Sequence, residues 1–232
     1  MTGRTSRRGQ WSVQELERLR QLLPRRGVAQ TAALLRRSPA SVQKKAFRLL
    51  RVPPRRGDWT DSDDSMLREA WGAVEPRLLG AMLGRSIADV RRRAVWLRAA
   101  VRSGPWTHAE RLRLKDLFGT RSDADLEVCL SRRRDDVLAM AQGLCLARDK
   151  RSGLRGAEGA RMPRWTPAEV ERLRQLYADR DNLEVARLLG RTVTSVANKA
   201  NLLGLHKSPA VLAEIGRQNV GIRHGTAAAA AN

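Results

Sequence analysis

The sequence predicts an all-α protein built from four tandem modules, each made of three short helices. Three observations predict this fold class. A pattern that starts with Trp and a hydroxyl residue occurs four times in the 232 residues, and the four copies align without a gap as far as a Leu 38 positions later. Within each copy, apolar residues recur at the three- and four-residue spacing of a helix that buries one face. No segment shows the alternation of apolar and polar residues that is typical of a half-buried strand.

Internal repeats of this kind indicate one supersecondary unit that is used several times. We refer to the four copies as repeats 1 to 4. The stretch before repeat 4 is rich in Gly and basic residues, so we expect a flexible linker that tethers this repeat loosely. Residues 208–219 are expected to form one further helix. The expected segments are a basic arm at 1–10, repeat 1 at 11–50, repeat 2 at 59–100, repeat 3 at 106–146, the linker at 147–164, repeat 4 at 165–205 and a tail at 206–232.

The first helix of each repeat has a clear start signal. A Ser or Thr follows the Trp, and an acidic residue follows three positions later, which is the spacing of a capping box. The acid also faces the positive end of the helix dipole. We expect the Trp itself to be buried. The Trp and acid pairs are Trp11 and Glu15, Trp59 and Asp63, Trp106 and Glu110, and Trp165 and Glu169.

The second and third helices are separated by a tight turn. The second helix stops at sequences such as Gly84-Arg85-Ser86, in which Gly ends one helix and the hydroxyl residue caps the next. The third helix carries Val, Ala and Leu at positions i, i+4 and i+7, which form its inward face. A tight turn between these two helices is the geometry of a helix-turn-helix. The inward Val residues are Val42, Val90, Val137 and Val196.

The charge of the chain favours a polyanionic partner. Lys and Arg number 45 against 24 acidic residues, which gives a formal net charge of +21. Such an excess points to nucleic acid or an anionic membrane. The sequence has no apolar stretch near 18 residues and no apolar signal core at the N-terminus. We therefore expect a soluble, intracellular protein, located in the cytoplasm or nucleoid of a bacterium or phage host, or in a eukaryotic nucleus.

The third helices carry the candidate DNA-binding residues. The residue two positions after the inward Val points away from the core. Lys and Arg can bond guanine, and Asn and Gln can pair with adenine, so repeats 1, 2 and 4 can read bases or hold phosphates. The alternative is a solvated basic helix face. The candidates are Gln43, Lys44, Lys45, Arg91, Arg92, Arg93, Thr194, Asn198 and Lys199.

Repeat 3 differs from the others on this face. It presents Asp135, Asp136, Leu138 and Ala139, which repel phosphate or offer no hydrogen bond to a base. We expect repeat 3 either to contact a protein partner or simply to pack against repeat 2. Trp96 also falls on the outward side of its helix, so it is either a contact residue or buried against repeat 3.

The connecting segments add further basic candidates. Short basic segments can lie along phosphates or enter a minor groove. In the first linker, two arginines follow Pro53-Pro54. The candidates in the arm and in this linker are Arg4, Arg7, Arg8, Arg55 and Arg56.

At this point the repeats resemble a known family. The segments Trp165-Thr166-x-x-Glu169, Val185-Ala186-x-Leu188-Leu189-Gly190-Arg191-Thr192 and Val196-x-Asn198-Lys199-Ala200 resemble a Myb/SANT-like, homeodomain-like helix-turn-helix repeat. Repeat 4 is also similar to GcrA-type helix-turn-helix proteins of bacteria and phages. The resemblance implies base reading from the middle of the third helix. Myb repeats usually have three spaced Trp, whereas only the first is present here, and some SANT relatives bind proteins instead of DNA.

No enzymatic chemistry is predicted. The histidines His108, His206 and His224 have no nucleophile or metal partner at a useful spacing, and no phosphate-binding loop or zinc motif occurs. Neither Cys129 nor Cys145 indicates a disulfide or a zinc site. We therefore expect no catalytic residue, metal, cofactor, small-molecule substrate or membrane partner.

The predicted function is sequence-specific binding of double-stranded DNA, as a transcription regulator. Two alternatives remain open. One is a DNA-recognition subunit of a phage packaging or recombination complex. The other is a SANT-like scaffold whose basic surface binds acidic proteins, a hypothesis that the apolar residues Trp96, Leu138 and Ala139 favour.

Overall fold

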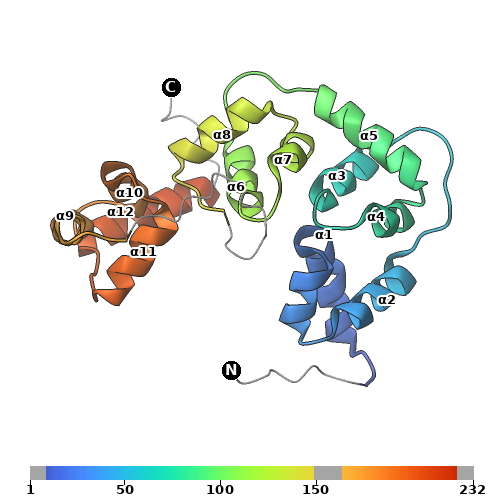
Figure 1. Cartoon of the computed structure of the whole chain (residues 1–232), viewed down its shortest axis with the longest axis horizontal. Coiled ribbons are helices and arrows are strands. Elements are labelled where there is room, and N and C mark those ends of the chain that lie inside the picture. The colour runs from blue at the N-terminus through green and yellow to red at the C-terminus, as the bar shows by residue number, and fades with distance from the viewer. Residues whose placement is uncertain (1–8, 149–163, 224–232) are drawn as a thin grey trace. The chain divides into compact units, whose positions relative to one another are not determined.

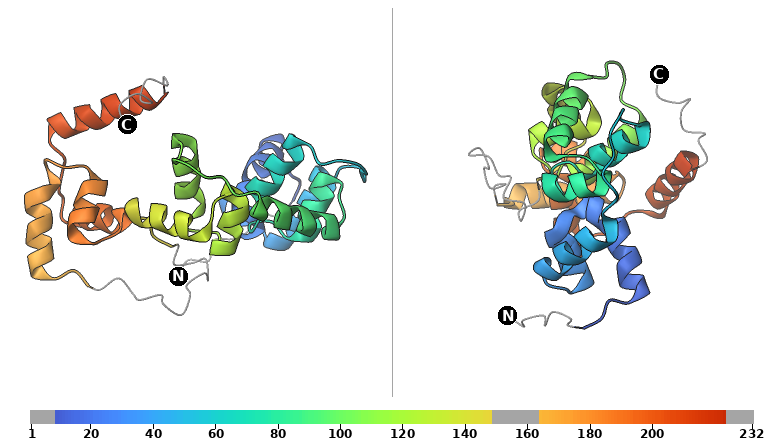
Figure 2. Two further views of the ribbon diagram at one scale, coloured as in Figure 1. Left: turned by 90° about the horizontal axis from the view of Figure 1, so that it is seen from above. Right: turned by 90° about the vertical axis from the view of Figure 1, so that its right-hand side faces the viewer.

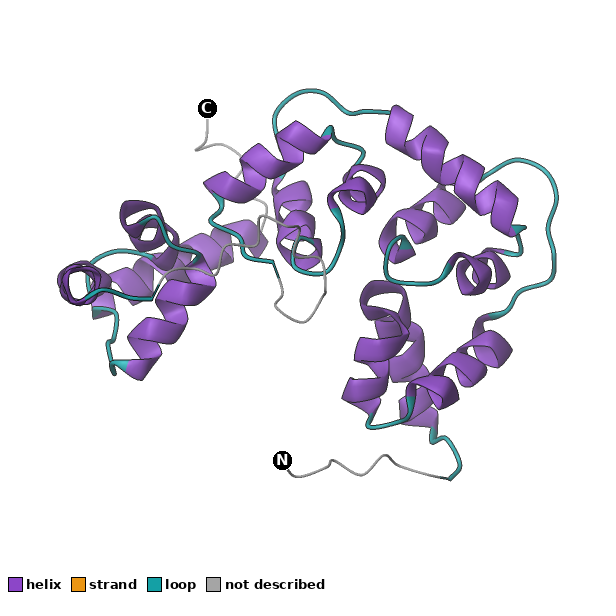
Figure 3. Cartoon of the chain, in the orientation of Figure 1, coloured by secondary structure: helices purple, strands orange, loops and turns teal. Residues whose placement is uncertain are grey.

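The computed structural model describes residues 9–148 and 164–223, and every regular element in this part is a helix (Figure 3). The predicted all-α class is confirmed. The chain forms two compact units, of which one ends at Leu138 and the other begins at Ala139. The predictions for Arg4, Arg7 and Arg8, and for the flexibility of the linker between 149 and 163, lie outside the described residues.

Twelve helices follow one another in the described part of the chain (Figure 1). Repeat 1 contains two of them, repeats 2 to 4 contain three each, and the last helix follows repeat 4, where a further helix was predicted. They are α1 (Val13–Leu35), α2 (Pro39–Leu50), α3 (Asp61–Ala70), α4 (Pro76–Leu83), α5 (Ile87–Ala99), α6 (His108–Leu117), α7 (Asp123–Leu130), α8 (Arg134–Gly143), α9 (Pro167–Tyr177), α10 (Asn182–Leu189), α11 (Val193–Leu202) and α12 (Pro209–Arg223).

Repeat 1 departs from the expected three helices because α1 runs through the first two helical segments. Pro24 stands inside it, and its backbone leaves helical geometry at Gly27, with φ 68° and ψ −179°. A Cβ on Gly27 would lie 2.2 Å from the carbonyl oxygen of Ala73 in repeat 2. The break therefore occurs where the backbones of repeats 1 and 2 come too close for any side chain.

The predicted helix starts are confirmed in every repeat. The hydroxyl residue accepts a hydrogen bond from the backbone N–H of the acid three positions later, and the acid accepts one from the backbone of the hydroxyl residue. Each capping box satisfies two of the amides that a helix start leaves without partners. The four N-cap residues are Ser12, Thr60, Thr107 and Thr166.

Repeats 1 and 2 share one hydrophobic core. Leu19 and Leu23 of α1 belong to the same buried cluster as Leu67 of α3 and Leu97 of α5, and Val128 of α7 also joins it. The helices of repeat 1 (blue) and repeat 2 (cyan to green) lie side by side in both views of Figure 2. Helix α1 contacts α3, and α2 contacts α4. Repeat 3 adds α7, which packs against α3 and α5.

One buried arginine joins the first three repeats. Arg121, near the end of the α6–α7 turn, is only 2% exposed. Its Nε donates to the carbonyl oxygen of Trp71 at 2.7 Å, and its Nη2 donates to that of Arg25 at 2.8 Å and of Glu69 at 3.4 Å. These carbonyls lie at the end of α3 and within α1. Arg121 thus satisfies backbone acceptors of repeats 1 and 2 from repeat 3.

The second unit has its own core. Leu173, Tyr177, Val185, Val196 and Ala200 of α9, α10 and α11 form one buried cluster. Lys207, two residues after the end of repeat 4, donates from Nζ to the carbonyl oxygen of Tyr177 at 2.9 Å and lies over the Tyr177 ring. Burial lowers the pKa of Lys207. The chain that leads into α12 is therefore attached to the end of α9.

Candidate nucleic-acid interface

The same turn precedes the third helix segment in all four repeats. One residue adopts a left-handed conformation, with φ of 53° at Arg36, 65° at Gly84, 51° at Ser131 and 61° at Gly190. In repeats 1, 2 and 4 the hydroxyl residue two positions later caps the next helix, and these N-caps are Ser38, Ser86 and Thr192. This turn fixes how α2, α5 and α11 emerge from their repeats.

The outward faces agree with the helical spacing of the sequence. The Val residues that define the inward face are between 0% and 1% exposed in all four repeats. The residue two positions later is exposed in every case, as predicted: Lys44, Arg92, Ala139 and Asn198. Among the other candidates, Arg91 and Thr194 are also exposed, whereas Lys199 is partly buried.

Two candidates of repeat 1 face neighbouring groups instead of open solvent. Gln43 is partly buried, and its Nε2 donates to Glu75 of repeat 2 at 3.4 Å. Lys45 is partly buried with its Nζ 5.6 Å from the centre of the Trp11 ring. Lys44 and Arg48, one turn further along α2, are the exposed cations of this helix. Arg48 was not predicted, although its i+4 spacing from Lys44 places both on one face.

Arg93 is a corrected candidate. Its side chain is only 20% exposed and makes a two-pronged contact with Asp64, from Nε to Oδ1 and from Nη2 to Oδ2, both at 2.7 Å. Its guanidinium also lies 3.8 Å from the Trp96 ring centre and 5.7 Å from the Trp59 ring centre. A bidentate, partly buried pair of this kind is among the strongest hydrogen-bonded contacts in proteins. Arg93 therefore holds α5 to α3, and it is not an outward cation.

The first linker is attached to repeat 2 along its backbone. The N–H of Val52 donates to Ala81 at 3.0 Å, and the N–H of Arg55 donates to Gly84 at 2.7 Å. The side chain of Arg55 binds Asp63 at 2.5 Å and the carbonyl oxygen of Leu83 at 3.2 Å. Arg55 is thus engaged with repeat 2, its side chain remains 49% exposed, and its contact with DNA stays a prediction.

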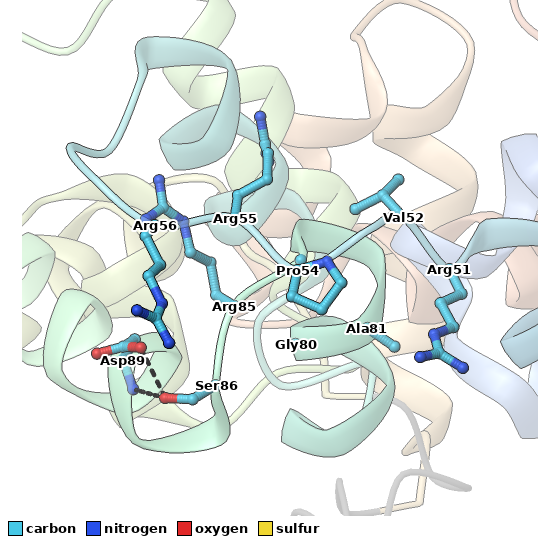
Figure 4. Close-up of a pocket in the computed structure, with 11 residues that line it drawn as sticks. Arg51, Val52, Pro54, Arg55, Arg56, Gly80, Ala81, Arg85, Ser86 and Asp89 are labelled. Atoms are coloured by element: carbon cyan, nitrogen blue, oxygen red, sulfur yellow. Dashed lines mark hydrogen bonds between the residues drawn. The ribbon is translucent and has the colours of Figure 1, made fainter.

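A basic groove of about 420 Å³ lies between this linker and the α4–α5 turn (Figure 4). Arg56 and Arg51 lie at opposite ends of the view, and the Arg56 guanidinium points toward Ser86 and Asp89. Both arginines are exposed. The prediction that Arg56 is available to a polyanion is therefore compatible with its position, and Arg51 is a further exposed cation at the other end of the groove.

A cluster that the sequence reasoning missed occurs in each repeat. An arginine 26 positions after the Trp binds the capping-box acid, stacks over the Trp ring, and donates to the carbonyls just before the Trp. Its guanidinium lies between 4.9 and 5.2 Å from the ring centre. These arginine side chains are 3% to 7% exposed. They are Arg37, Arg85, Arg132 and Arg191.

The contacts of this cluster tie the turn to the start of each repeat. In repeat 3, Arg132 Nη2 lies 2.9 Å from Glu110 Oε2, and Nη1 and Nη2 donate to the carbonyls of Gly104 and Pro105 at 2.6 and 3.1 Å. Repeat 1 has the same arrangement, with Arg37 and Glu15 2.9 Å apart. The signal in the sequence was the recurrence of Arg at one repeat position, which was interpreted only as part of a helix stop.

The cluster corrects the expectation that the repeat Trp residues are fully buried. All four are partly exposed. One ring face is covered by the arginine and the rest packs on the core, so the cation–π contact replaces part of the burial that was expected. The Trp is therefore a platform for the arginine as well as a core residue.

Repeat 2 has a looser form of the cluster because its acid is Asp63 instead of Glu. Arg85 Nη2 is 3.5 Å from Asp63 Oδ2, and the buried Arg85 Nε has no acceptor among the described residues. In the other repeats the Nε donates to Glu at 3.0 to 3.2 Å. The shorter Asp63 side chain does not span both nitrogens, and it is bound from the other side by Arg55.

The clusters shift the acidity of their carboxyl groups. The hydrogen bond from Arg37 lowers the pKa of Glu15 from 4.5 to about 2. Burial raises the pKa of Glu110 and of Asp63, but hydrogen bonds from Arg132 or Arg55 and from the capping backbone outweigh it, so both lie below their usual range. The acids are therefore charged in the fold at neutral pH.

The outer face of α8 carries the opposite charge. Asp135, Asp136 and Ala139 are exposed, and Leu138 is partly buried. The hydroxyl cap of the other repeats is absent, because Arg133 stands at that position, and the first amide of α8 donates to Glu127 at 3.3 Å instead. Repeat 3 thus keeps the turn and the cluster, but its exposed cations, Arg133 and Arg134, precede the acids and leave the outward positions after Val137 without a positive charge.

Membrane-spanning helices and metal-binding clusters are both absent from residues 9–148 and 164–223. None of the helices there is long and apolar enough to cross a bilayer. No group of three or more His, Cys, Asp or Glu side chains in the same residues is arranged to hold a metal ion.

Comparisons with known proteins give few relatives. No family model matches the chain. No solved structure matches it. Two uncharacterized proteins of Listeria innocua are similar to it: Lin1255/Lin1742 is 30% identical over 153 residues, and Lin2600 is 29% identical over 153 residues. Each match covers 65% of this chain and 64% of the relative, so the chain spans less than two thirds of the length of these relatives.

Proposed function

We propose that this protein binds double-stranded DNA sequence-specifically, as a transcription regulator, with α2, α5 and α11 in the major groove. In this proposal the repeats are Myb/SANT-like modules of the helix-turn-helix type. One observation supports this proposal most directly. The same turn, with one left-handed residue, precedes α2 and α5, and both of these helices have exposed cations on their outer faces. Lys44, Arg91 and Arg92 lie on the outer faces of α2 and α5, where a groove-bound helix presents its side chains to base edges.

The outward residues of the third helices differ in whether they already form an ion pair within the protein. Arg92 is 77% exposed and paired with Asp89 three positions earlier. An exposed pair of this kind contributes little to stability, so a guanine or phosphate can replace Asp89 at little cost. Lys44 makes no ion pair with any described residue, and Arg91 makes none either. In repeat 4, Asn198 and Thr194 are exposed and suited to adenine and to phosphate.

Repeat 3 takes a different role in this proposal. The exposed Asp135 and Asp136 repel phosphate, while α7 packs against α3 and α5 and Arg121 binds carbonyls of repeats 1 and 2. Repeat 3 therefore supports the DNA-binding repeats from the side and does not read DNA.

Selection of bound duplexes from a random pool tests the function. We expect one enriched sequence, and an observed binding constant for it that falls with salt at a log–log slope of about −0.9 per phosphate neutralised. Polyglutamate serves as the control polyanion, because a scaffold for acidic proteins would bind it equally well. A pool that stays random, or a slope near zero, would refute the proposal.

A further inference from the structure

The outward face of α5 is not uniformly polar. One turn after Arg92, Val95 is 69% exposed and Trp96 is 52% exposed. Trp96 is therefore not buried against repeat 3, which settles one alternative left open by the sequence. Exposed apolar residues that adjoin one another on a surface mark contact sites more often than isolated ones do.

The same arrangement occurs in the other unit. On α11, the exposed Asn198 is followed four residues later by Leu202, which is 78% exposed. Arg92 and Trp96 have this same spacing on α5. Residues four apart on a helix are neighbours on one face. Two repeats thus place a group that can read a base next to a large exposed apolar side chain.

Trp96 is held in position before any partner binds. The Arg93 guanidinium stacks 3.8 Å from its ring centre, and Arg93 is itself fixed by its two contacts with Asp64. Such support reduces the side-chain entropy that is lost on binding. The Trp96 ring is therefore already ordered on the surface before a partner binds.

The charges around Trp96 favour DNA over an apolar protein surface as the occupant. The exposed Arg92 lies one turn before Trp96, and the exposed Arg91 lies one turn before Val95. The whole chain has a net charge of +21. In the major groove, the apolar feature that a base presents is the C5-methyl group of thymine. The apolar Trp96 side chain is complementary to such a methyl group, and the surrounding arginines are complementary to the phosphates that flank it.

We propose that Trp96 with Val95, and Leu202 in repeat 4, read the C5-methyl group of a pyrimidine, with thymine as its source. This inference rests on the proposed DNA binding and names what the second turn of the reading helix recognises. Four residues of helix span about 6 Å, and base pairs are 3.4 Å apart. The methyl group therefore lies roughly two base pairs from the base that Arg92 or Asn198 contacts.

Repeats 1 and 3 provide contrasts. Arg48 stands in repeat 1 where repeat 2 has Trp96, and Gly143 stands there in repeat 3. These residues present no large apolar surface to a methyl group. The inference thus assigns methyl reading to repeats 2 and 4 alone.

The experiment uses the full chain and the duplex enriched from a random pool. Each thymine is replaced in turn by deoxyuracil, which removes only the methyl group. We expect one position in the repeat 2 half of the site to lose affinity by about four-fold, the value of one buried methyl group. In Trp96→Gln the same replacement has no effect. Leu112→Gln, on the 47% exposed Leu112 of α6, is the matched control and keeps the full loss.

A second variant and two further base replacements distinguish the possible results of this experiment. If Trp96→Gln does not fold, Leu202→Gln gives the same test in repeat 4. Cytosine and 5-methylcytosine at the sensitive position distinguish reading of the methyl group alone from reading of the T·A pair. If every deoxyuracil duplex binds as tightly as the thymine duplex, methyl reading is wrong and the proposed DNA binding stands. If no duplex binds selectively, both proposals fail.

Discussion

Repeats 2 and 3 have the same internal framework and opposite outer faces. Both begin with a capping box and place an arginine over the repeat Trp, at 5.2 Å for Arg85 and 5.0 Å for Arg132. On the outside, α5 exposes Arg91 and Arg92, whereas α8 exposes Asp135 and Asp136. The residues that hold a repeat together are therefore separate from those on its exposed outer face.

The largest effect is expected from a substitution that disrupts the arginine–acid–Trp cluster of repeat 3. Arg132→Met leaves the mostly buried Glu110 without its main partner, and removal of one member of a buried pair costs about 3–5 kcal/mol. Arg85→Met should cost less, because Arg55 still binds Asp63. Urea unfolding of the full chain measures both, with the exposed Arg133→Met as control. Equal losses in all three variants would show that the cluster does not stabilise the repeat.

A second prediction concerns acid. The folded pKa of Glu15 is about 2 against 4.5 without its partners, so its contribution is present above pH 4.5 and is lost as pH falls from there toward 2. The full contribution is at most about 3.4 kcal/mol. The urea midpoint should fall between pH 5 and pH 3, and Glu15→Gln should make this fall shallower. A midpoint that is constant over this range contradicts the account.

A third prediction compares the turns before α5 and α8. Gly84 has φ 65°, and a Cβ there would lie 2.4 Å from the carbonyl oxygen of Pro53. Gly84→Ser should therefore cost about 2 kcal/mol or more, from left-handed strain and displacement of the linker. Ser131 adopts φ 51° and accepts a hydrogen bond from Arg68 at 3.2 Å.

Ser131→Gly should change stability by less than about 1 kcal/mol, because relief of the strain offsets the lost hydrogen bond. Thermal unfolding of the two variants measures the difference. If Gly84→Ser is as mild as Ser131→Gly, the first linker is not held against the turn as described.

The sequence predicted the local features well. The four capping boxes, the inward Val residues and the outward positions of Lys44 and Arg92 all follow from short-range spacing, and the structure has them. These features depend only on residues within one or two helical turns, where periodicity is informative.

Features that depend on distant segments were not predicted. Arg93 was grouped with Arg91 and Arg92 because nothing local reveals that Asp64, 29 positions earlier, lies against it. The pairing of Arg132 with Glu110 spans 22 residues, and Arg121 reaches carbonyls of two other repeats. Such contacts are tertiary, so a pattern within a single helix does not contain them.

The central claim is that exposed charge on the third helix, and not the repeat framework, decides which repeats bind DNA. Affinity for the selected duplex at fixed salt tests it with a matched pair, Arg92→Asp in repeat 2 and Ala139→Asp in repeat 3, which change equivalent exposed positions. The account predicts a loss of about 1–3 kcal/mol or more for Arg92→Asp and almost none for Ala139→Asp. Comparable losses in two folded variants would contradict it, because repeat 3 would then contact DNA as repeat 2 does.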